Sequence, residues 1–311
     1  MSGAVKVFAP ATVANVAAGF DILGFAVRAP GDEVTATLNG PPGVRVTRIE
    51  GDGGVLPREA ERNTAGVAAL GLLAKAGSGA GVDLSIRKMM PLGSGLGSSA
   101  ASGVAAAVAV NELLGRPLSR TELLPFCMEA ERIACGAAHA DNAAPALLGG
   151  FVLVRSYAPL DVVTIAAPDD LAAAVVHPHV EIRTEDARKI LRTKIAMKDA
   201  VTQWGNTAGL IAGLLTGDYA LIGRSLTDVI IEPARAILIP GFHRVKDAAL
   251  ESGALGCSIS GSGPSIFALC RGLDAAERAG AAMARVFASL GIGADVHVSL
   301  INRDGAVVIE R

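Results

Sequence analysis

The sequence predicts an α+β protein in which strands and helices are mixed along the whole chain. Segments of alternating apolar residues are interspersed with segments of helical apolar spacing, without the regular strand–helix alternation of a doubly wound sheet. The 311 residues suffice for about two domains. Hydrophobic residues make up 51% of the chain and charged residues 19%, which is typical of a folded globular protein.

The first half of the sequence carries strand-like and helical patterns around one glycine-rich loop. Apolar alternation predicts strands at residues 5–8, 34–38, 44–49, 82–86, 151–154, 162–166 and 172–176. Helical spacing predicts helices at residues 63–75 and 121–135, and a further helix follows the glycine-rich loop. Ser98 or Ser99 is expected to cap the start of that helix, and Gly115 and Pro117 are expected to end it.

The second half continues the same mixture of elements. The predicted helices are at residues 186–192, 198–215 and 274–290, with another before Gly253. A turn-rich stretch lies at residues 232–240, and residues 258–270 combine a glycine loop with a strand. Strands at residues 296–301 and 307–309 are expected to pair as a hairpin. We expect two domains, residues 1–160 and 161–311, although no Ser- or Pro-rich linker marks the boundary.

Composition and charge argue against several classes of protein. A net charge of −2 and an aromatic content of 4% give neither the basic nor the stacking surface of a nucleic-acid-binding protein. No apolar run reaches the ~18 residues of a membrane span, and the N-terminus lacks a signal-peptide core, so we expect a cytoplasmic protein. The histidines and cysteines show no metal-binding spacing. The expected buried, reduced thiols are Cys127, Cys135, Cys257 and Cys270.

The strongest functional signal is the segment PLGSGLGSSAA at residues 91–101, with a glycine at every second position in its middle. A P-loop needs a lysine after its last glycine, and none is present. The stretch GLGSSA fits a dinucleotide-binding fingerprint, but no second strand ending in an acid follows, because Glu112 and Glu122 both fall in helical patterns. Two interpretations remain: an ordinary tight turn before a capped helix, or a loop whose amides and helix start hold a phosphate.

Three motifs, in order along the chain, resemble those of the GHMP small-molecule kinases. They are residues 91–101, similar to the family's phosphate-binding signature P-x-x-x-G-L-G-S-S-A-A, residues 10–21 (PATVANVAAGFD) and residues 256–264 (GCSISGSGP). The resemblance covers nearly the whole chain and favours the phosphate-binding interpretation. It implies a two-domain kinase with a ribosomal S5-like, ATP-binding N-terminal domain and a ferredoxin-like C-terminal domain.

Within this family, further features are most similar to members that phosphorylate L-homoserine. They are Asn15 with the following Gly-Phe-Asp21, residues 139–145 (HADNAAP), Thr184 with Arg188, and residues 232–240 (EPARAILIP). One departure is visible, because the family's Asn-Leu-Gly-Pro-Gly-Phe-Asp is here Asn-Val-Ala-Ala-Gly-Phe-Asp. The resemblance implies transfer of a phosphoryl group from ATP, with Mg²⁺, to the hydroxyl of L-homoserine in threonine biosynthesis, and it implies a homodimer.

The resemblance also assigns residues to the parts of such a site. The ATP-binding set is Asn63, Pro91, Gly93, Ser94, Gly95, Leu96, Gly97, Ser98, Ser99 and Ala100. The catalytic set is Asn15, Ser99, Glu131 and Asn142, of which Ser99 and Glu131 are expected to hold Mg²⁺. The substrate-binding set is Asn15, Asp21, His139, Thr184, Arg188, Arg235 and Gly261.

The chemistry of these side chains suits a small amino acid with a hydroxyl group. Asp21 suits its ammonium group, and Arg188 and Arg235 suit its carboxylate, since a guanidinium can donate two hydrogen bonds to a carboxylate. Asn15 and His139 are expected at its hydroxyl end. Mevalonate has no ammonium group for Asp21, and a sugar would also fit poorly.

Several alternatives stay open from the sequence. Glu131 could be a solvated helix carboxylate like Glu129, and either arginine a surface ion pair. The chain could phosphorylate a different small alcohol, or bind its ligands without turnover. The position aligned with an aspartate base in some relatives is Asn142, an amide that cannot accept a proton. We therefore expect transfer without a dedicated protein base, and leave open whether Asp141 assists.

Overall fold

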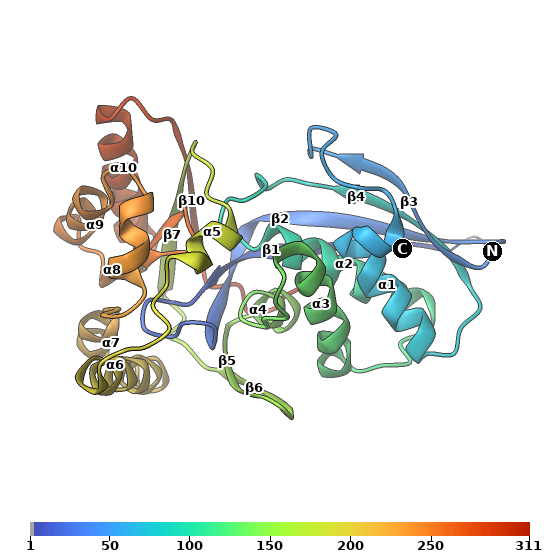
Figure 1. The fold of residues 1–311 in the computed structure, drawn as a ribbon, viewed down its shortest axis with the longest axis horizontal. Helices are drawn as coiled ribbons and strands as arrows, with labels where there is room; N and C mark the ends of the chain where they lie inside the picture. Colours follow the sequence, from blue (N-terminus) through green and yellow to red (C-terminus); the bar gives the residue numbers. More distant parts are fainter. Residues whose placement is uncertain (1–2) are drawn as a thin grey trace.

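The computed structural model describes residues 3–311 and contains two sheets, each with its own helices (Figure 1). One sheet has seven strands and the other has four. Helices lie against both sheets, and strands and helices alternate irregularly along the chain. The predicted α+β class is therefore confirmed.

The first unit contains the elements up to residue 165 and the last strand of the chain. They are β1 (Ala4–Ala14), β2 (Leu23–Asn39), β3 (Gly43–Glu50), α1 (Thr64–Lys75), β4 (Gly81–Arg87), α2 (Ser98–Leu113), α3 (Arg120–Cys135), α4 (Ala143–Leu148), β5 (Phe151–Tyr157), β6 (Leu160–Ile165) and β11 (Val307–Glu310). A 3-10 turn at Ala60–Arg62 precedes α1. The strand order is β11-β1-β2-β4-β3, while β5 pairs with β2 and β6 pairs with β5.

Helix α2 lies in the middle of the first unit and fixes the position of the site. It packs against β1 and β2 as well as against α1 and α3, and every residue from Ala100 to Asn111 is buried. Its sequence is apolar on all sides and rich in alanine, which is typical of a helix surrounded by protein. The start of α2 is therefore held at a fixed place inside the molecule.

The second unit has the order of a ferredoxin-like domain with additional helices. Its elements are β7 (Leu171–Pro178), α5 (Thr184–Lys189), α6 (Met197–Thr216), α7 (Tyr219–Ser225), α8 (Glu232–Arg235), α9 (Phe242–Glu251), β8 (Gly256–Ile259), β9 (Ile266–Arg271), α10 (Leu273–Ser289) and β10 (Ala294–Leu300). The four strands are antiparallel in the order β10-β7-β9-β8, as the ferredoxin-like prediction requires. Helices α9 and α10 pack on one face of this sheet, and the other face joins the core of the first unit.

The predicted hairpin between the last two strands is wrong. β10 pairs with β7 in the second sheet, whereas β11 pairs with β1 in the first. The connection is held by the first unit: the Asn302 amide donates to the Ala26 carbonyl (2.9 Å), and Arg120 donates to the Ala306 carbonyl (2.7 Å). The first sheet thus takes strands from both sides of residue 160, and the division of the chain at that residue stays a prediction.

Residues 232–238 are helical where a turn-rich stretch was expected. Helix α8 continues directly into a 3-10 turn at Ala236–Leu238. Pro233 lies in the first turn of α8. Amides in that turn have no acceptor within the helix, so the missing amide hydrogen of proline costs no hydrogen bond there. The segment therefore projects Arg235 from a short helix rather than from a flexible turn.

The cysteines that can be described are buried free thiols, as predicted. They are Cys127, Cys257 and Cys270, and burial raises the pKa of the Cys127 thiol to about 12. The side chain of Cys135 lies outside the described residues. Within residues 3–311, none of the helices combines the length and apolarity that crossing a bilayer demands.

Candidate active site

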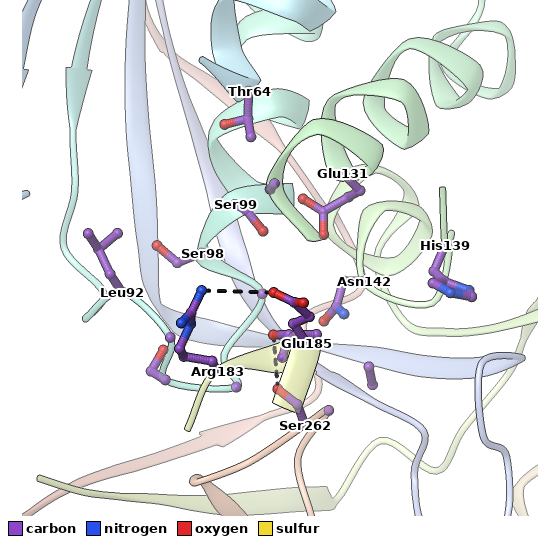
Figure 2. A pocket seen from close by; sticks show the side chains of 18 of the residues that line it. Thr64, Leu92, Ser98, Ser99, Glu131, His139, Asn142, Arg183, Glu185 and Ser262 are labelled. Carbon is purple, nitrogen blue, oxygen red and sulfur yellow. Dashed lines mark hydrogen bonds and ion pairs between the residues drawn. The ribbon is translucent and has the colours of Figure 1, made fainter. Parts of the chain in front are cut away.

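A cavity of about 780 Å³ lies where loops of the two units converge (Figure 2). Its walls come from the loop after β1, the glycine loop before α2, α3, the residues before α4, α5 and the loop between β8 and β9. We call residues 93–99 with Glu131 the loop end of the cavity. We call Asp21, Arg188 and Arg235 its charged end.

The glycines of the loop end are required by contacts within the chain. Gly93, Gly95 and Gly97 have φ values of 64°, 77° and 69°, a conformation that L-residues rarely adopt. A Cβ atom on Gly95 would lie 2.6 Å from the Ser260 carbonyl oxygen, and one on Gly97 would overlap the Thr12 hydroxyl. The close approach that these glycines permit is thus to β1 and to the loop between β8 and β9.

Hydrogen bonds hold this loop from both units. The Thr12 amide in β1 donates to the Leu96 carbonyl (3.0 Å). From the second unit, the Ser260 hydroxyl donates to the Gly95 carbonyl (2.6 Å), and the Ser265 hydroxyl donates to the Ser94 carbonyl (2.6 Å). These bonds engage carbonyls of the loop and none of its amide groups.

The predicted serine cap of α2 is wrong. The N-cap residue is Gly97, and no side chain caps the helix. The Ser98 hydroxyl instead donates to Asp32 (3.2 Å). The first turn of α2 therefore keeps amide groups without a side-chain acceptor, and together with the positive end of the helix dipole they favour an anion at the loop end.

A buried ion pair below this turn was not predicted from the sequence. Lys88 and Asp32 are in contact, and the Lys88 ammonium also donates to the Ser98 carbonyl (2.7 Å) and the Ser102 hydroxyl (2.7 Å). Burial lowers the pKa of Lys88, and the charge of Asp32 opposes that effect. The pair ties β4 and β2 to the first turn of α2, and Lys88 also lines the cavity.

Glu131 is buried beside Ser99 rather than solvated like Glu129. Its side chain in α3 and the Ser99 hydroxyl in α2 face the same part of the cavity (Figure 2). Burial raises the pKa of Glu131 to about 7, while a hydrogen bond with Ser99 and the charge of Lys88 act to lower it. A carboxylate and a hydroxyl are hard oxygen ligands that suit Mg²⁺.

Within the described residues, no group of three or more His, Cys, Asp and Glu side chains could hold a metal. A cation beside Ser99 and Glu131 would therefore take most of its remaining ligands from a bound molecule or from water. That ligand set is typical of Mg²⁺ sites that share substrate phosphates.

At the charged end, the predicted acid and one predicted arginine pair with each other. Arg188 donates to both carboxylate oxygens of Asp21, at 3.0 and 3.1 Å. Arg235 is buried and donates to the Gly261 carbonyl (2.8 Å), and both guanidinium groups lie over the Phe20 ring. Burial and the neighbouring Arg188 lower the pKa of Arg235 to about 10.

The loop after β1 carries Asp21 in a strained conformation. Asn15, Val16 and Ala17 have φ values of 71°, 40° and 59°, and Val16 and Ala17 stand where the family has Leu-Gly. The Asn15 side chain donates to the Gly261 carbonyl (2.8 Å) and accepts from the Asp21 amide (3.0 Å). Asn15 therefore connects the loop after β1 to the loop between β8 and β9 and so fixes the shape of the charged end.

Helix α6 supports the same loop from behind. The Gln203 amide and the Thr207 hydroxyl donate to the Ala18 carbonyl, at 3.2 and 2.9 Å. Gln203 also donates to Asp228 (2.8 Å), which accepts hydrogen bonds from the amides that lead into α8. The strained loop and the helix that carries Arg235 are thus held by one buried network.

His139 and Thr184 also line the cavity. The His139 ring is 3.7 Å from Asp21, and neither of its nitrogens has a hydrogen-bond partner among the described residues. Burial lowers the pKa of His139, so the ring is neutral at pH 7. The Thr184 hydroxyl shares a hydrogen bond with Ser262 (3.2 Å).

Asp141 and Asn142 precede α4 and differ in their surroundings. Asn142 accepts a hydrogen bond from the Thr12 hydroxyl (2.7 Å), which fixes its amide beside Gly97. Asp141 is buried, and burial together with the charges of Asp21 and Glu131 raises its pKa to about 7. These neighbours thus give the cavity one fixed amide and, besides Glu131, a second carboxyl group whose pKa is raised to about 7.

The structure brings most of the predicted residues together. Those that line the cavity are Asn15, Asp21, Asn63, Gly93, Ser94, Gly95, Gly97, Ser98, Ser99, Glu131, His139, Asn142, Thr184, Arg188, Arg235 and Gly261. Leu96 and Ala100 point into the hydrophobic core, and Pro91 lies on the surface outside the lining. Asn63 caps α1 by accepting from the Ala65 amide (3.0 Å), so its side chain serves the fold.

Sequence reasoning missed several residues of the lining. Lys88, Thr64, Arg183 and Glu185 belong to it. The only sequence signal for Lys88 is its position just before the glycine loop, and a lysine at that position matches no motif. Arg183 and Glu185 form an exposed pair near the loop end (Figure 2).

The fold and the site together are those of a small-molecule kinase, with an uncapped helix start at one end of a cavity and a set of paired charges at the other. Two family models match the chain: "GHMP kinases N terminal domain" over residues 63–150 and "GHMP kinases C terminal" over residues 210–289. The chain belongs to the GHMP kinase family.

Within that family, the chain is similar over its whole length to homoserine kinases. It is 54% identical to a homoserine kinase of Chlorobium phaeobacteroides (strain BS1), with 97% of this chain and 98% of the relative covered. The crystal structure of homoserine kinase from Cytophaga hutchinsonii is 58% identical, covers 98% of this chain and 97% of its own, and has a TM-score of 0.96. A mevalonate kinase of L. major shares the fold at 17% identity, with a TM-score of 0.68 over 96% and 97% of the two chains.

Proposed function

We propose that this protein transfers the γ-phosphoryl group of ATP to the side-chain hydroxyl of L-homoserine, giving O-phospho-L-homoserine for threonine biosynthesis. One observation carries the proposal: a single cavity joins the open start of α2 to the Asp21–Arg188 pair and Arg235. The similarity to homoserine kinases over nearly the full chain supports it. A cytoplasmic location and a homodimer belong to the same proposal.

An amino acid would bind the charged end by separating the Asp21–Arg188 ion pair and pairing with each of its two members. Its ammonium group would take Asp21, and its carboxylate would take Arg188 and Arg235, so every charge keeps an opposite one. The neutral His139 ring has two nitrogens without a hydrogen-bond partner among the described residues, and it lies beside Asp21. It would therefore hydrogen-bond the hydroxyl that accepts the phosphoryl group.

The loop end would hold the triphosphate through backbone amides of residues 93–99. The helix dipole alone contributes only ~0.3–2 kcal/mol, so several amide hydrogen bonds must supply most of the affinity. Ser99 and Glu131 would hold Mg²⁺, which would neutralise negative charge on the triphosphate. Lys88 fixes the carbonyl of Ser98 and so keeps the first turn in place.

The transfer would proceed without a dedicated protein base. Asn142 cannot accept a proton, and its oxygen is engaged by Thr12. Positioning can supply up to ~7–11 kcal/mol of a barrier, and a loose transition state makes early deprotonation unnecessary, so the proton can pass to the phosphate itself. A pH–rate profile tests this mechanism. It would be contradicted if the wild-type rate fell as the pH passed through the pKa of one carboxyl group and this fall disappeared in Asp141→Asn.

A coupled ADP assay with a panel of alcohols tests the proposed function. We expect ADP formation with L-homoserine, none with mevalonate or shikimate, and a product identified as phosphohomoserine by mass spectrometry. Arg235→Ala should abolish turnover of homoserine while ATP still binds. ADP formation with another alcohol but not homoserine would refute the substrate, and binding of both ligands without product would identify a non-catalytic relative.

A further inference from the structure

The Tyr157 hydroxyl joins two segments of the cavity wall, although Tyr157 itself does not line the cavity. It donates a hydrogen bond to the Asp21 carbonyl (2.6 Å) and accepts one from the Ala140 amide (3.3 Å). Burial raises the pKa of this hydroxyl above its usual value, so it stays protonated at neutral pH and can donate. One oxygen atom thus connects the loop after β1 to the residues before α4.

Strand β5 brings Tyr157 to this place because it runs beside the residues that follow Asp21. It pairs antiparallel with the start of β2, and the Val154 amide donates to the Ile22 carbonyl (2.7 Å). The pairing of β5 with β6 shifts by one residue between Val154 and Ser156, and a bulge of this kind re-aims the side chains beside it. Tyr157 is therefore held by a sheet, which fixes a side chain more precisely than a loop does.

Asp21 needs support on both sides because its backbone conformation is unfavourable. Its φ is 60°, in the left-handed region that residues other than glycine rarely adopt. Such a conformation persists only where the surrounding structure fixes it. The Asp21 amide donates to the Asn15 side chain (3.0 Å), and the Asp21 carbonyl accepts from Tyr157 (2.6 Å). These two bonds hold the backbone from which the Asp21 carboxylate reaches Arg188.

The second segment that Tyr157 holds carries three polar side chains of the cavity. They are His139, Asp141 and Asn142, of which Figure 2 shows the first and the last. Ala140 lies between them and is fully buried, so its amide would lose its partner without the Tyr157 hydroxyl. The His139 ring also packs edge-on against the Tyr157 ring, with 6.1 Å between the ring centres. Tyr157 thus fixes both the ring of His139 and the backbone beside it.

In the proposed function, the ammonium group of the substrate pairs with Asp21, and the substrate hydroxyl bonds to His139. The number of methylene groups between these two groups sets their separation in the substrate. The site must hold Asp21 and His139 at the matching separation, and the Tyr157 hydroxyl is bonded to the backbone of both segments. We infer, on the basis of the proposed function, that Tyr157 is a positioning residue that sets the length of the amino acid that the cavity accepts.

Tyr157→Phe tests the assignment, because it removes the hydroxyl and keeps the ring beside His139. In steady-state kinetics of the full chain, the KM for L-homoserine should rise roughly 10-fold, while the KM for ATP stays within about twofold. The length preference is the ratio of kcat/KM for L-homoserine to that for L-serine, which is one methylene group shorter. A pocket distinguishes one methylene group by about 10- to 200-fold, and this preference should fall roughly fivefold to tenfold in the variant.

Tyr219→Phe is the matched control. Tyr219 is the other of the two tyrosines in the sequence, and its hydroxyl donates to the exposed Asp170 outside the cavity lining. Its kinetics and length preference should equal those of the wild type, and thermal melts should show both variants folded. The length preference compares two substrates on one preparation, so a partly unfolded variant would not change it.

A double variant shows whether Tyr157 acts through the segment that carries His139. When Tyr157→Phe is combined with His139→Phe, the two losses in kcat/KM for homoserine should be less than multiplicative, because both changes disturb the same contact. Fully multiplicative losses, an unchanged length preference in Tyr157→Phe, or an equal change in Tyr219→Phe would overturn the role of Tyr157 while homoserine remains the substrate. A wild type that forms no ADP with homoserine would instead refute the proposed function, and the role of Tyr157 with it.

Discussion

The loop end of the cavity is built from backbone held against its own chain, whereas the charged end is built from side chains that a loop and two short helices carry. At the loop end, Gly95 and Gly97 leave no room for a Cβ atom, and the contacts are rigid. At the charged end, Asp21 and Arg188 form an ion pair, which a charged ligand can separate by pairing with each member. The same cavity therefore has one end fixed by sterics and one end set by exchangeable charge.

This difference implies that substitutions at the two ends fail in different ways. A change in the glycine loop moves the helix start, β1 and the loop between β8 and β9, so it should affect folding and both substrates together. A change at the charged end removes one partner of a ligand, so it should affect the affinity for that ligand alone. The variants that follow test this division.

The largest effect is expected from Gly97→Ala. Its Cβ atom would overlap the Thr12 hydroxyl and lie 2.9 Å from the Asn142 side-chain oxygen, at a φ of 69°. Strain and overlap together should lower the free energy of unfolding by ~3 kcal/mol or more, and displacement of the loop should lower kcat/KM for both substrates by roughly 10³-fold. Urea unfolding and steady-state kinetics measure the two effects.

Gly93→Ala is the matched control for that variant. Gly93 has a similar φ of 64°, but the nearest atom to an added Cβ lies 3.6 Å away, in ordinary contact. The variant should therefore show only the cost of the left-handed conformation, ~1–2 kcal/mol. Equal losses in both variants would mean that backbone conformation, and not the contact with Thr12, fixes the loop.

The next largest effect is expected from Arg188→Ala at the charged end. Removing one partner of a partly buried pair leaves Asp21 uncompensated and removes a ligand of the substrate carboxylate. The KM for homoserine should rise by roughly 10²-fold, while the KM for ATP stays within about twofold. Arg183→Ala removes an exposed ion pair with Glu185 and should leave the KM for homoserine nearly unchanged. A parallel rise in the KM for ATP would break the division between the two ends.

The loop end was largely predictable from the sequence because its signals are local. Alternating glycines and an alanine-rich helix adjoin one another within residues 91–110, and the motif matched a known family. Its atomic contacts were not predictable: the serine cap failed because Ser98 meets Asp32, 66 residues away. Local capping rules consider only residues near the start of the helix, so they miss an acceptor that a distant strand supplies.

The charged end was predictable only as a set of residue types. Asp21, Arg188 and Arg235 lie in three separate segments, and no local pattern indicates that Asp21 and Arg188 pair with each other. The crossing of β11 to the first sheet was missed for a related reason. Apolar alternation indicates that a segment is a strand but not which strand it joins, and here Arg120 and Asn302 decide the route.

Asp141→Asn should change stability rather than ligand affinity. Its folded-state pKa is raised from 3.8 to about 7 by burial, so the carboxyl contributes stability that is complete below pH 3.8 and is lost as the pH rises to about 7. The amide keeps the shape without the charge, and at pH 8 it should raise the free energy of unfolding by ~2 kcal/mol. Urea unfolding at pH 5 and pH 8 measures this, and an equal change at both pH values would contradict it.

The smallest effect is expected from His139→Phe. This variant decides whether His139 contacts the substrate hydroxyl that accepts the phosphoryl group. Burial lowers the pKa of His139, so the ring is neutral above pH 6.5 and can offer only a neutral hydrogen bond to the substrate hydroxyl. Losing one such bond should lower kcat/KM for homoserine about fivefold to tenfold, ~1–1.4 kcal/mol, without changing the shape of the pH profile above pH 6.5. His179→Phe, at an exposed pair with Asp295, is the matched control and should leave kcat/KM unchanged. If the wild type instead lost activity with rising pH through a step that His139→Phe lacks, the charged imidazolium would be the active form. The charged end would then extend as far as His139, and the substrate hydroxyl would be held by charge as well.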